Sequence, residues 1–448
     1  MASPATVALD LVGRYQRNRA RSRAIFDLLN DDTYYSRPIV LRHPIVFYEG
    51  HLPGFSFNTL VKKALGRPAI DGRLETLFAR GIDPHESAAG GSAAETVQAQ
   101  WPSRRDVRAF VDEADRQVVD ALANSDLDRP GDPFLDHAEA AFTILEHEEM
   151  HQETLLYMWH RLPLEEKRRP DGYRPLTGAA APRQEWVNVP AGRATLGVDR
   201  GRIPFGWDNE FPGLSAHVDA FAIERHDVTN AQFLDFVEDG GYQEAGLWAP
   251  ADWDWIRSER IEHPLFWERG EDGWLWRGMF DRVALPAAWP VYVSHAEAAA
   301  FACWNAARLP TEAEYQRAAY GSPSGERRVP WGDADPGTDR AVIDFASWDP
   351  QPAGSHPTGR SAWGVDDLIG NGWEWTSTVF APFPGFRPMA SYPEYSADFF
   401  DGEHFVMKGG SPATARELVR PTFRNWFRAR YPYVYATFRC VRNSSSRP

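Results

Sequence analysis

Apolar and polar residues follow one another over the first 160 positions with the period of amphipathic helices. Four segments share this period: 7–29, a segment from Ile45 onward, 107–122 and 135–159. Ser103 can cap the third helix, and Pro53 next to Gly54 should kink the second. The stretch 84–102 is rich in Gly, Ala and Ser, which predicts a loop. Four helices of this length predict an antiparallel bundle over residues 1–165.

The pattern changes after the fourth helix. Residues 166–184 are rich in Pro, Gly, Ala and charge, which predicts a linker between two domains. In the second domain, 185–448, the segment 186–197 reads as strands with turns between them, and 230–237 and 294–307 read as short helices. Most of the 18 tryptophans of the chain lie in this part, which is typical of a loop-rich α+β domain packed with large flat side chains.

Composition excludes several classes of function. The net charge of −15 and the lack of a basic stripe argue against a nucleic-acid partner. No apolar run approaches the ~18 residues of a membrane span, and positions 1–29 hold five arginines instead of an apolar signal core. Two cysteines are too few for a disulfide framework, which indicates a reducing compartment. We therefore expect a cytoplasmic protein that acts on small molecules.

The fourth helix carries the densest candidate chemistry, His147-Glu-Glu-Met-His151. On a helix, His147 and His151 share one face and suit a single metal ion. The spacing is also that of HExxH zinc peptidases, in which Glu148 would activate a bound water. A further histidine, His51, is expected to face inward from the second helix. The histidines therefore predict a metal site, with a zinc hydrolase as one alternative.

These motifs resemble those of a known family. The run Tyr48-Glu-Gly-His51 followed by HxxxHxE resembles the DinB-type iron-binding half of the ergothioneine-pathway sulfoxide synthases. The second half resembles the formylglycine-generating-enzyme fold, a C-type-lectin-like α+β domain. The matching motifs lie at 189–192, 227–233, 290–291, 308–315, 367–376, 409–411 and 438–440. The two resemblances in this order cover nearly the whole chain.

The resemblance implies a non-haem Fe(II) ion bound by His51, His147 and His151. Three imidazoles leave up to three positions of an octahedral ion open. These positions would accept a substrate imidazole, a thiolate or selenolate, and O₂. The resemblance also implies a tyrosine near the metal, as a proton donor or as a guard against thiol dioxygenation. Tyr392 and Tyr395 are the candidates, and Tyr431, Tyr433 and Tyr435 lie further on.

The second domain is expected to provide the substrate-binding wall. The segment 420–426 matches the family signature whose Asn-Trp pair, here Asn425 and Trp426, contacts hercynine, and Arg424 precedes this pair. An aromatic face attracts a quaternary ammonium group. The alternative is that Trp426 belongs to the core.

The next residues depart from the actinobacterial pattern. Members that use γ-glutamylcysteine have an Asp and an Arg where this chain has Phe427 and Tyr431. An aromatic pair suits a sugar ring better than a doubly charged dipeptide. This pattern resembles the selenoneine-forming branch of the family, which joins hercynine to a selenosugar.

We therefore predict O₂-dependent C–Se bond formation at the hercynine imidazole C2. A thiol donor, namely cysteine, γ-glutamylcysteine or a thiosugar, is the main alternative. A lectin-like ligand-binding protein without catalysis is a third possibility. Formylglycine-generating chemistry is not expected, because its second cysteine is present as Cys440 but the first is replaced by Tyr435. We expect Cys440 to be a buried thiol and Cys303 to lie in the core.

Overall fold

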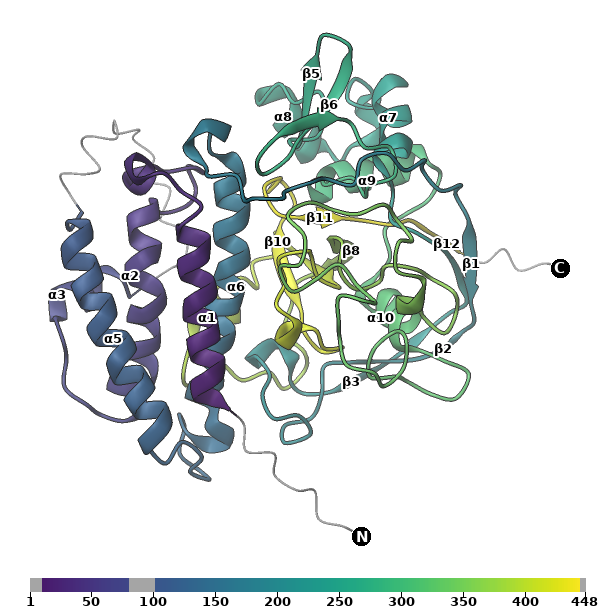
Figure 1. Cartoon of the computed structure of the whole chain (residues 1–448). Coiled ribbons are helices and arrows are strands. Elements are labelled where there is room, and N and C mark those ends of the chain that lie inside the picture. The colour runs from purple at the N-terminus through teal and green to yellow at the C-terminus, as the bar shows by residue number, and fades with distance from the viewer. Residues whose placement is uncertain (1–9, 80–100, 444–448) are drawn as a thin grey trace. The chain divides into compact units, whose positions relative to one another are not determined.

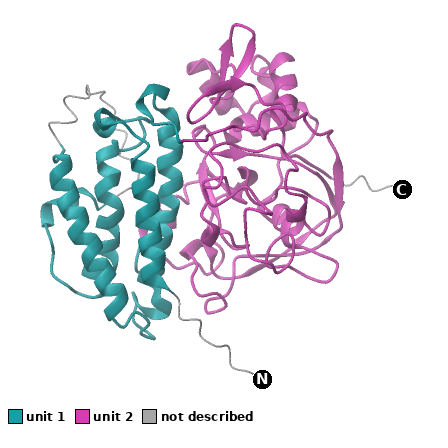
Figure 2. Cartoon of the chain, in the orientation of Figure 1, with its two compact units in different colours: residues 1–170, 390–392 teal, residues 171–389, 393–448 magenta. Residues whose placement is uncertain are grey.

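The structure is a computed structural model of the chain that describes residues 10–79 and 101–443. Apart from its last two positions, the loop predicted for 84–102 lies outside the described residues. The chain divides into two compact units (Figure 2). Unit 1 comprises 1–170 together with 390–392, and unit 2 comprises 171–389 and 393–448.

Unit 1 is a bundle of four long helices that run side by side (Figure 1). They are α1 (Leu11–Phe26), α2 (Ile45–Ser56), α5 (Arg104–Asn124) and α6 (Glu139–Arg161). Both α1 and α2 pack against α5 and α6. Shorter pieces connect them: η1 (Asp31–Tyr35), η2 (Phe57–Ala64), α3 (Gly72–Leu77), η4 (Asp136–Ala138) and η5 (Leu164–Glu166).

The helix boundaries follow from local chemistry. Ser103 caps α5 as predicted, since its side chain accepts a hydrogen bond from the Asp106 backbone N–H. The second helix continues through Pro53 and then widens into the π-helical segment η2. A widened turn is one way in which a helix accommodates a residue that has no N–H to donate. Helix α6 begins at Glu139, directly after Ala138 adopts a left-handed conformation with φ of 55°.

The helices of the bundle enclose an apolar core, to which the helices that carry the histidines contribute. Its members include Phe55 and Leu60 from the second helical region, Val118 from α5 and Ile144 from α6. Full burial of such a side chain stabilises the fold by about 1.5–3 kcal/mol. Tyr392 packs against this core as a partly buried ring.

Unit 2 is built from short strands and loops. Four sheets are found within its described residues. The first contains β1 (Trp186–Val189), β4 (Phe221–Glu224) and β12 (Val441–Asn443), and the second orders β10 (Asn425–Arg428), β9 (His404–Lys408), β8 (Trp373–Val379) and β11 (Ala436–Thr437). The others are the pair β2 (Gly192–Leu196) and β3 (Leu214–Val218), and the group β5 (Trp267–Gly270), β6 (Gly273–Arg277) and β7 (Arg282–Ala284). Neighbouring strands are antiparallel, except that β11 runs parallel to β8.

Short helices, all in unit 2, complete the second fold. They are α7 (Asn230–Glu238), α8 (Pro250–Ser258), α9 (His295–Trp304), α10 (Glu312–Tyr320) and α11 (Glu394–Ala397). The predicted helices at 230–237 and 294–307 correspond to α7 and α9, and capping boxes begin both. Helices α8 and α10 were not predicted, although Thr311 and Glu314 form a capping box in α10.

The element order confirms the predicted succession of a helical bundle and an α+β domain. Cys440 is buried as expected, whereas the expectation for Cys303 was wrong, because its side chain is exposed on α9. The apolar face of that short helix includes Phe301 and Ala302, and Cys303 lies on the other side. None of the described helices has both the length and the apolarity of a membrane span.

Candidate metal centre

Three histidines of unit 1 converge on one point. His51 comes from α2, and His147 and His151 come from consecutive turns of α6. One ring nitrogen from each of the three lies within 4.8 Å of the others. The ring centroids are 4.4 Å apart for His147 and His151, and 5.1 and 4.9 Å from that of His51. The three residues proposed from the sequence are therefore brought together by the fold.

The ring nitrogens of this cluster are buried without partners. Nε2 of His51, both nitrogens of His147 and Nδ1 of His151 have no hydrogen-bond partner among the described residues. A buried polar atom without a hydrogen bond costs roughly 1–3 kcal/mol. Such atoms persist when a ligand outside the chain satisfies them. The cluster therefore fits a metal ion that accepts one lone pair from each imidazole.

The fold sets the tautomer of one ring. Nδ1 of His51 lies 2.7 Å from the backbone carbonyl oxygen of Phe78. A carbonyl oxygen only accepts, so Nδ1 carries the proton and Nε2 presents its lone pair to the cluster. The Phe78 ring also packs closely against α2 at Gly50. A Cβ at this position would lie only 2.5 Å from the ring, so a larger residue would not fit. Sequence patterns could not show this contact, which joins residues far apart in the chain.

Burial also sets the charge of the three rings. It lowers the pKa of His51 to about 4, although the hydrogen bond to the Phe78 carbonyl acts in the opposite direction. Burial lowers the pKa of His147 and His151 well below the usual range, and the neighbouring histidines lower it further. All three rings are therefore neutral at pH 7, which is the form that binds metals.

Aromatic rings fix the imidazole planes. Phe55 stacks on His147 with a centroid distance of 3.5 Å and an interplanar angle of 10°. Phe47 stacks on His51 at 4.9 Å and 19°. These apolar faces exclude water and limit ring rotation, so the lone pairs keep their direction.

The two glutamates of the HExxH motif are held by α1. Arg19 Nη1 and Ser22 Oγ both donate to Oε1 of Glu148, at 2.8 and 2.6 Å. Arg14 donates twice to Glu149, at 2.9 and 2.7 Å. A general base for a metal-bound water must reach that water. The contacts of Glu148 instead tie α6 to α1, which disfavours the zinc-hydrolase alternative.

The two candidate tyrosines lie in different surroundings. Tyr392 belongs to unit 1, where its ring centroid is 6.2 Å from that of His147 and 5.2 Å from that of Phe55. Tyr395 belongs to unit 2, where it stacks on Trp207 at 3.8 Å. Tyr392 thus contacts a histidine of the cluster through its ring.

The predicted substrate-binding segment forms the edge strand β10 of the four-stranded sheet. Trp426 is half-buried and stacks on Phe380 at 4.2 Å, with an interplanar angle of 5°. Tyr395 meets the Trp426 ring edge-on at 5.1 Å. Asn425 lies beside it and accepts a hydrogen bond from the Trp426 backbone N–H through its own side-chain oxygen, at 2.9 Å. These rings form an aromatic cluster within unit 2.

All three guanidinium nitrogens of Arg424 form hydrogen bonds within unit 2. Its Nε and Nη2 donate to the carboxylate of Glu312 at 2.9 and 3.1 Å, and Nη1 donates to the backbone carbonyls of Asn209 and Ala381. These bonds hold the Arg424 side chain inside unit 2. Phe427 and Tyr431, the other predicted contacts, stack on each other at 5.1 Å and 16°.

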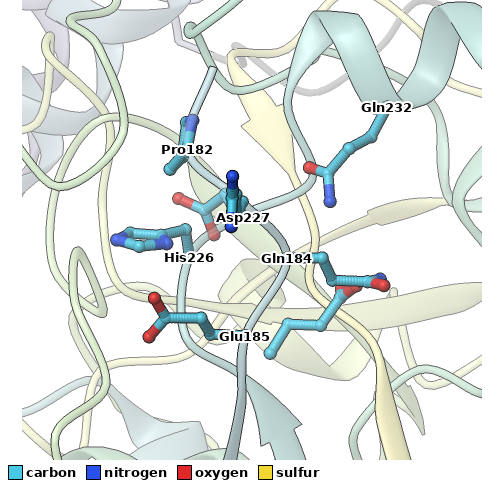
Figure 3. A pocket seen from close by; sticks show the side chains of 8 residues that line it. Pro182, Gln184, Glu185, His226, Asp227 and Gln232 are labelled. Carbon is cyan, nitrogen blue, oxygen red and sulfur yellow. The ribbon is translucent and has the colours of Figure 1, made fainter. Parts of the chain in front are cut away.

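The structure also shows a small pocket in unit 2 (Figure 3). Its lining consists of Pro182, Arg183, Gln184, Glu185, Glu224, His226, Asp227 and Gln232. Asp227 accepts a hydrogen bond from buried Arg439 at 2.9 Å. None of the residues predicted for metal or substrate lines this pocket, so it is separate from the candidate site.

Comparison with known proteins agrees with this architecture. Residues 14–155 match the DinB superfamily, and residues 175–444 match the Sulfatase-modifying factor enzyme 1-like domain. The second match alone covers more than half of the chain. Fold and site thus define a two-domain protein in which a DinB-type bundle with a histidine cluster precedes a formylglycine-enzyme-type domain.

Three relatives show which proteins this chain resembles in sequence. It is 35% identical over 339 residues to the hercynine oxygenase of Mycolicibacterium smegmatis, covering 72% of this chain and 74% of that protein. It is 27% identical over 504 residues to ergothioneine biosynthesis protein 1 of Neurospora crassa, covering 93% of this chain and 56% of the relative. It is also 30% identical over 310 residues to the formylglycine-generating enzyme of Mycobacterium tuberculosis, covering 57% and 97%. The chain belongs to the ergothioneine-pathway-type sulfoxide synthase family.

Proposed function

We propose that this chain is a non-haem Fe(II) oxygenase that joins the imidazole C2 of hercynine to the selenium of a selenosugar, which leads to selenoneine. The observation that carries the metal site is the cluster of three neutral imidazoles, two buried and one partly buried, of which four ring nitrogens have no hydrogen-bond partner among the described residues. Hercynine is proposed because the relative with 35% identity is named hercynine oxygenase.

The donor set fits iron. Three imidazole nitrogens suit Fe(II) and leave up to three coordination positions open. Iron bound there would hold the hercynine imidazole and the selenolate side by side and would pass their electrons to O₂. In the balanced reaction, the hercynine C2–H and the selenol lose their hydrogens to one oxygen atom, which leaves as water. The second oxygen atom oxidises selenium to the selenoxide, so O₂ accepts four electrons in total.

Residues of this chain would perform the remaining tasks. Tyr392, next to His147, is proposed to donate a proton during reduction of O₂. The face of Trp426 is proposed to attract the trimethylammonium group of hercynine, which cannot form hydrogen bonds. The ring of Tyr395 packs edge-on against Trp426 and would hold that face in place.

The choice of selenium rests on the aromatic pair Phe427 and Tyr431. Their stacked rings offer apolar faces to a sugar ring and no charge to a dipeptide. The names of the relatives fit a thiol donor at least as well, so a sulfoxide synthase that uses cysteine, γ-glutamylcysteine or a thiosugar is the second candidate.

The deciding experiment offers the Fe(II)-loaded protein hercynine and O₂ with each donor in turn. The donors are a selenosugar, the matching thiosugar, cysteine and γ-glutamylcysteine, and product mass and O₂ uptake are followed. We expect the highest kcat/KM with the selenosugar. A preference for γ-glutamylcysteine would contradict the selenium proposal, and lack of O₂ uptake with every donor would contradict the oxygenase.

A paired variant tests the donor residues directly. Replacing Phe427 by Asp and Tyr431 by Arg introduces the two charges found in relatives that grip γ-glutamylcysteine. We expect this double variant to lose at least about 10-fold in kcat/KM for the selenosugar, equivalent to about 1.4 kcal/mol. Conversion of hercynine with γ-glutamylcysteine should rise in the same variant. An unchanged donor preference would show that these positions do not line the donor site.

A further inference from the structure

A short segment of the second family domain is held by unit 1. Residues 390–392 lie within the stretch that matches the Sulfatase-modifying factor enzyme 1-like domain, yet they group with the helical bundle. The backbone N–H and the hydroxyl of Ser391 both donate to Oε1 of Glu139, at 3.2 and 2.8 Å. The Ser391 hydroxyl also lies 3.0 Å from Thr143 Oγ1. Two residues of α6 thus hold one serine.

The chemistry of these groups gives the bonds a direction. An ionised carboxylate only accepts hydrogen bonds, so Ser391 must use its hydroxyl proton on Glu139. The Thr143 hydroxyl donates to the Glu139 backbone carbonyl at 2.8 Å, so its contact with Ser391 Oγ at 3.0 Å shares that proton or is a packing contact beside the Glu139 bond. Lys63 adds a third contact, since its Nζ donates to the carbonyl of Ala390 at 2.9 Å. Ser391 and Thr143 are both buried, and buried hydrogen bonds are costly to break.

The clamp lies on the same helix face as the metal site. Glu139, Thr143, His147 and His151 follow one another at intervals of four residues on α6. Residues spaced in this way stack one turn above the next, roughly 6 Å apart. A single rigid helix therefore carries both the groups that hold Ser391 and two of the three histidines.

We propose that Glu139 and Thr143 are positioning residues that clamp Ser391 and thereby hold the next residue, Tyr392, against His147. The proposal rests on the proposed function for the role of Tyr392. Neither clamp residue touches a substrate. They fix the distance between Tyr392 and the metal, because the same helix, α6, holds Ser391 and carries His147 and His151.

The kinetic test combines Glu139→Ala with Tyr392→Phe. We expect Glu139→Ala to lower kcat about 10-fold, or about 1.4 kcal/mol, at unchanged metal content. Glu139→Gln keeps an oxygen that can accept both bonds from Ser391, so its kcat should stay within about 2-fold of the native value. In the Glu139→Ala background, Tyr392→Phe should cause little further loss, since the two changes remove one shared arrangement. Additive losses would overturn the proposal.

A second test does not depend on hercynine. The Ser391 amide should exchange its hydrogen at least about 10-fold faster in Glu139→Ala than in the native chain. With 3-fluorotyrosine at position 392, Co(II) added to the histidines should shift the ¹⁹F signal, and this shift should shrink in Glu139→Ala. Thr143→Val offers a second variant if Glu139→Ala does not fold.

Glu394→Ala is the matched control, because this exposed glutamate lies three residues from Ser391 and outside the clamp. We expect it to leave exchange, the ¹⁹F shift and kcat unchanged. Unchanged exchange and an unchanged ¹⁹F shift in Glu139→Ala would overturn the clamp. If the native chain does not convert hercynine, the proposed function fails while these two measurements still decide the clamp.

Discussion

Unit 1 and unit 2 each bury a cluster of polar side chains, but the two clusters are satisfied in different ways. In unit 2, fully buried Arg439 donates to Glu374 at 2.6 and 2.9 Å and to Asp227 at 2.9 Å. In unit 1, Nε2 of His51, both ring nitrogens of His147 and Nδ1 of His151 have no hydrogen-bond partner among the described residues. The cation of the first cluster is thus paired within the fold, whereas the second cluster needs a ligand.

The difference shows how buried polar groups report function. Opposite charges in the Arg439 cluster stabilise one another, and this offsets the cost of removing them from water. Three neutral imidazoles have no such attraction, and His51 lowers the pKa of both His147 and His151. Their proximity therefore makes physical sense when a cation binds between them.

The largest expected effect comes from removing one histidine. His51→Ala deletes the nitrogen held toward the cluster by the Phe78 carbonyl. We expect Fe(II) affinity to fall by at least about 100-fold, since even loss of an outer hydrogen-bond partner costs about 10- to 100-fold. Turnover should be abolished. Metal content after dialysis and O₂ uptake measure both, and full metal loading in the variant would contradict the assignment.

In unit 2, removing the buried cation is expected to lower stability and to leave metal binding unchanged. Arg439→Met leaves the carboxylates of Asp227 and Glu374 buried without their cation. Breaking a buried pair in this way costs roughly 3–5 kcal/mol of unfolding free energy. Urea unfolding measures the loss, and metal binding by the fraction that stays folded should be unchanged. A loss below about 1 kcal/mol would show that the pairing contributes little.

Replacing Glu148 is expected to have a smaller effect. The size of this effect distinguishes the proposed oxygenase from a zinc hydrolase. Glu148→Gln keeps the oxygen that accepts from Ser22 but removes the charge that pairs with Arg19. We expect a loss of about 1–2 kcal/mol in unfolding free energy and turnover within a few-fold of native. Complete loss of turnover, with zinc in the purified protein, would favour the hydrolase.

A last effect, which appears only as a change of stability with pH, concerns a buried acid of unit 2 whose hydrogen-bond donors are neutral. Burial raises the pKa of Asp349 to about 6, although Tyr173 donates to its carboxylate at 2.5 Å and the Met279 backbone also donates. The unfolded value is about 3.9, so the folded chain binds this proton more tightly and stability falls as pH rises from about 4 to about 6. Asp349→Asn should remove this fall.

Unfolding free energy of both proteins at pH 4.5 and pH 7.5 measures the effect. Relative to the native chain, Asp349→Asn should gain on the order of 1–3 kcal/mol between the two values. The ionic partners of Asp366, by contrast, hold the pKa of that carboxyl well below its usual range, through bonds from His226, Arg360 and Arg225 that outweigh burial. The stability that this gives is present above about pH 4 and is lost as pH falls below that value, so Asp366→Asn should run parallel to the native chain between pH 4.5 and pH 7.5 and differ from it in slope only below about pH 4. A profile of Asp349→Asn parallel to the native one would contradict the assignment of Asp349.

The sequence by itself determined much of unit 1. The period of apolar residues located α1, α2, α5 and α6, because burying one face of a helix imposes its repeat on the sequence. The spacing of His147 and His151 placed both on one helix face for the same reason. In unit 2, α10 was missed although its Thr311 and Glu314 form a capping box, since its apolar pattern is short.

The tertiary structure decided which of these residues meet. It placed His51 beside the other two histidines, gave it the Phe78 carbonyl as partner, and turned Glu148 and Glu149 toward α1. It also grouped Tyr392 with unit 1 and Tyr395 with unit 2, although the sequence treats the two residues alike. Such choices depend on packing between segments distant in the chain, whereas periodicity and spacing report only local geometry. The sequence thus supplied the ligands, and the fold supplied their shared, unpartnered centre.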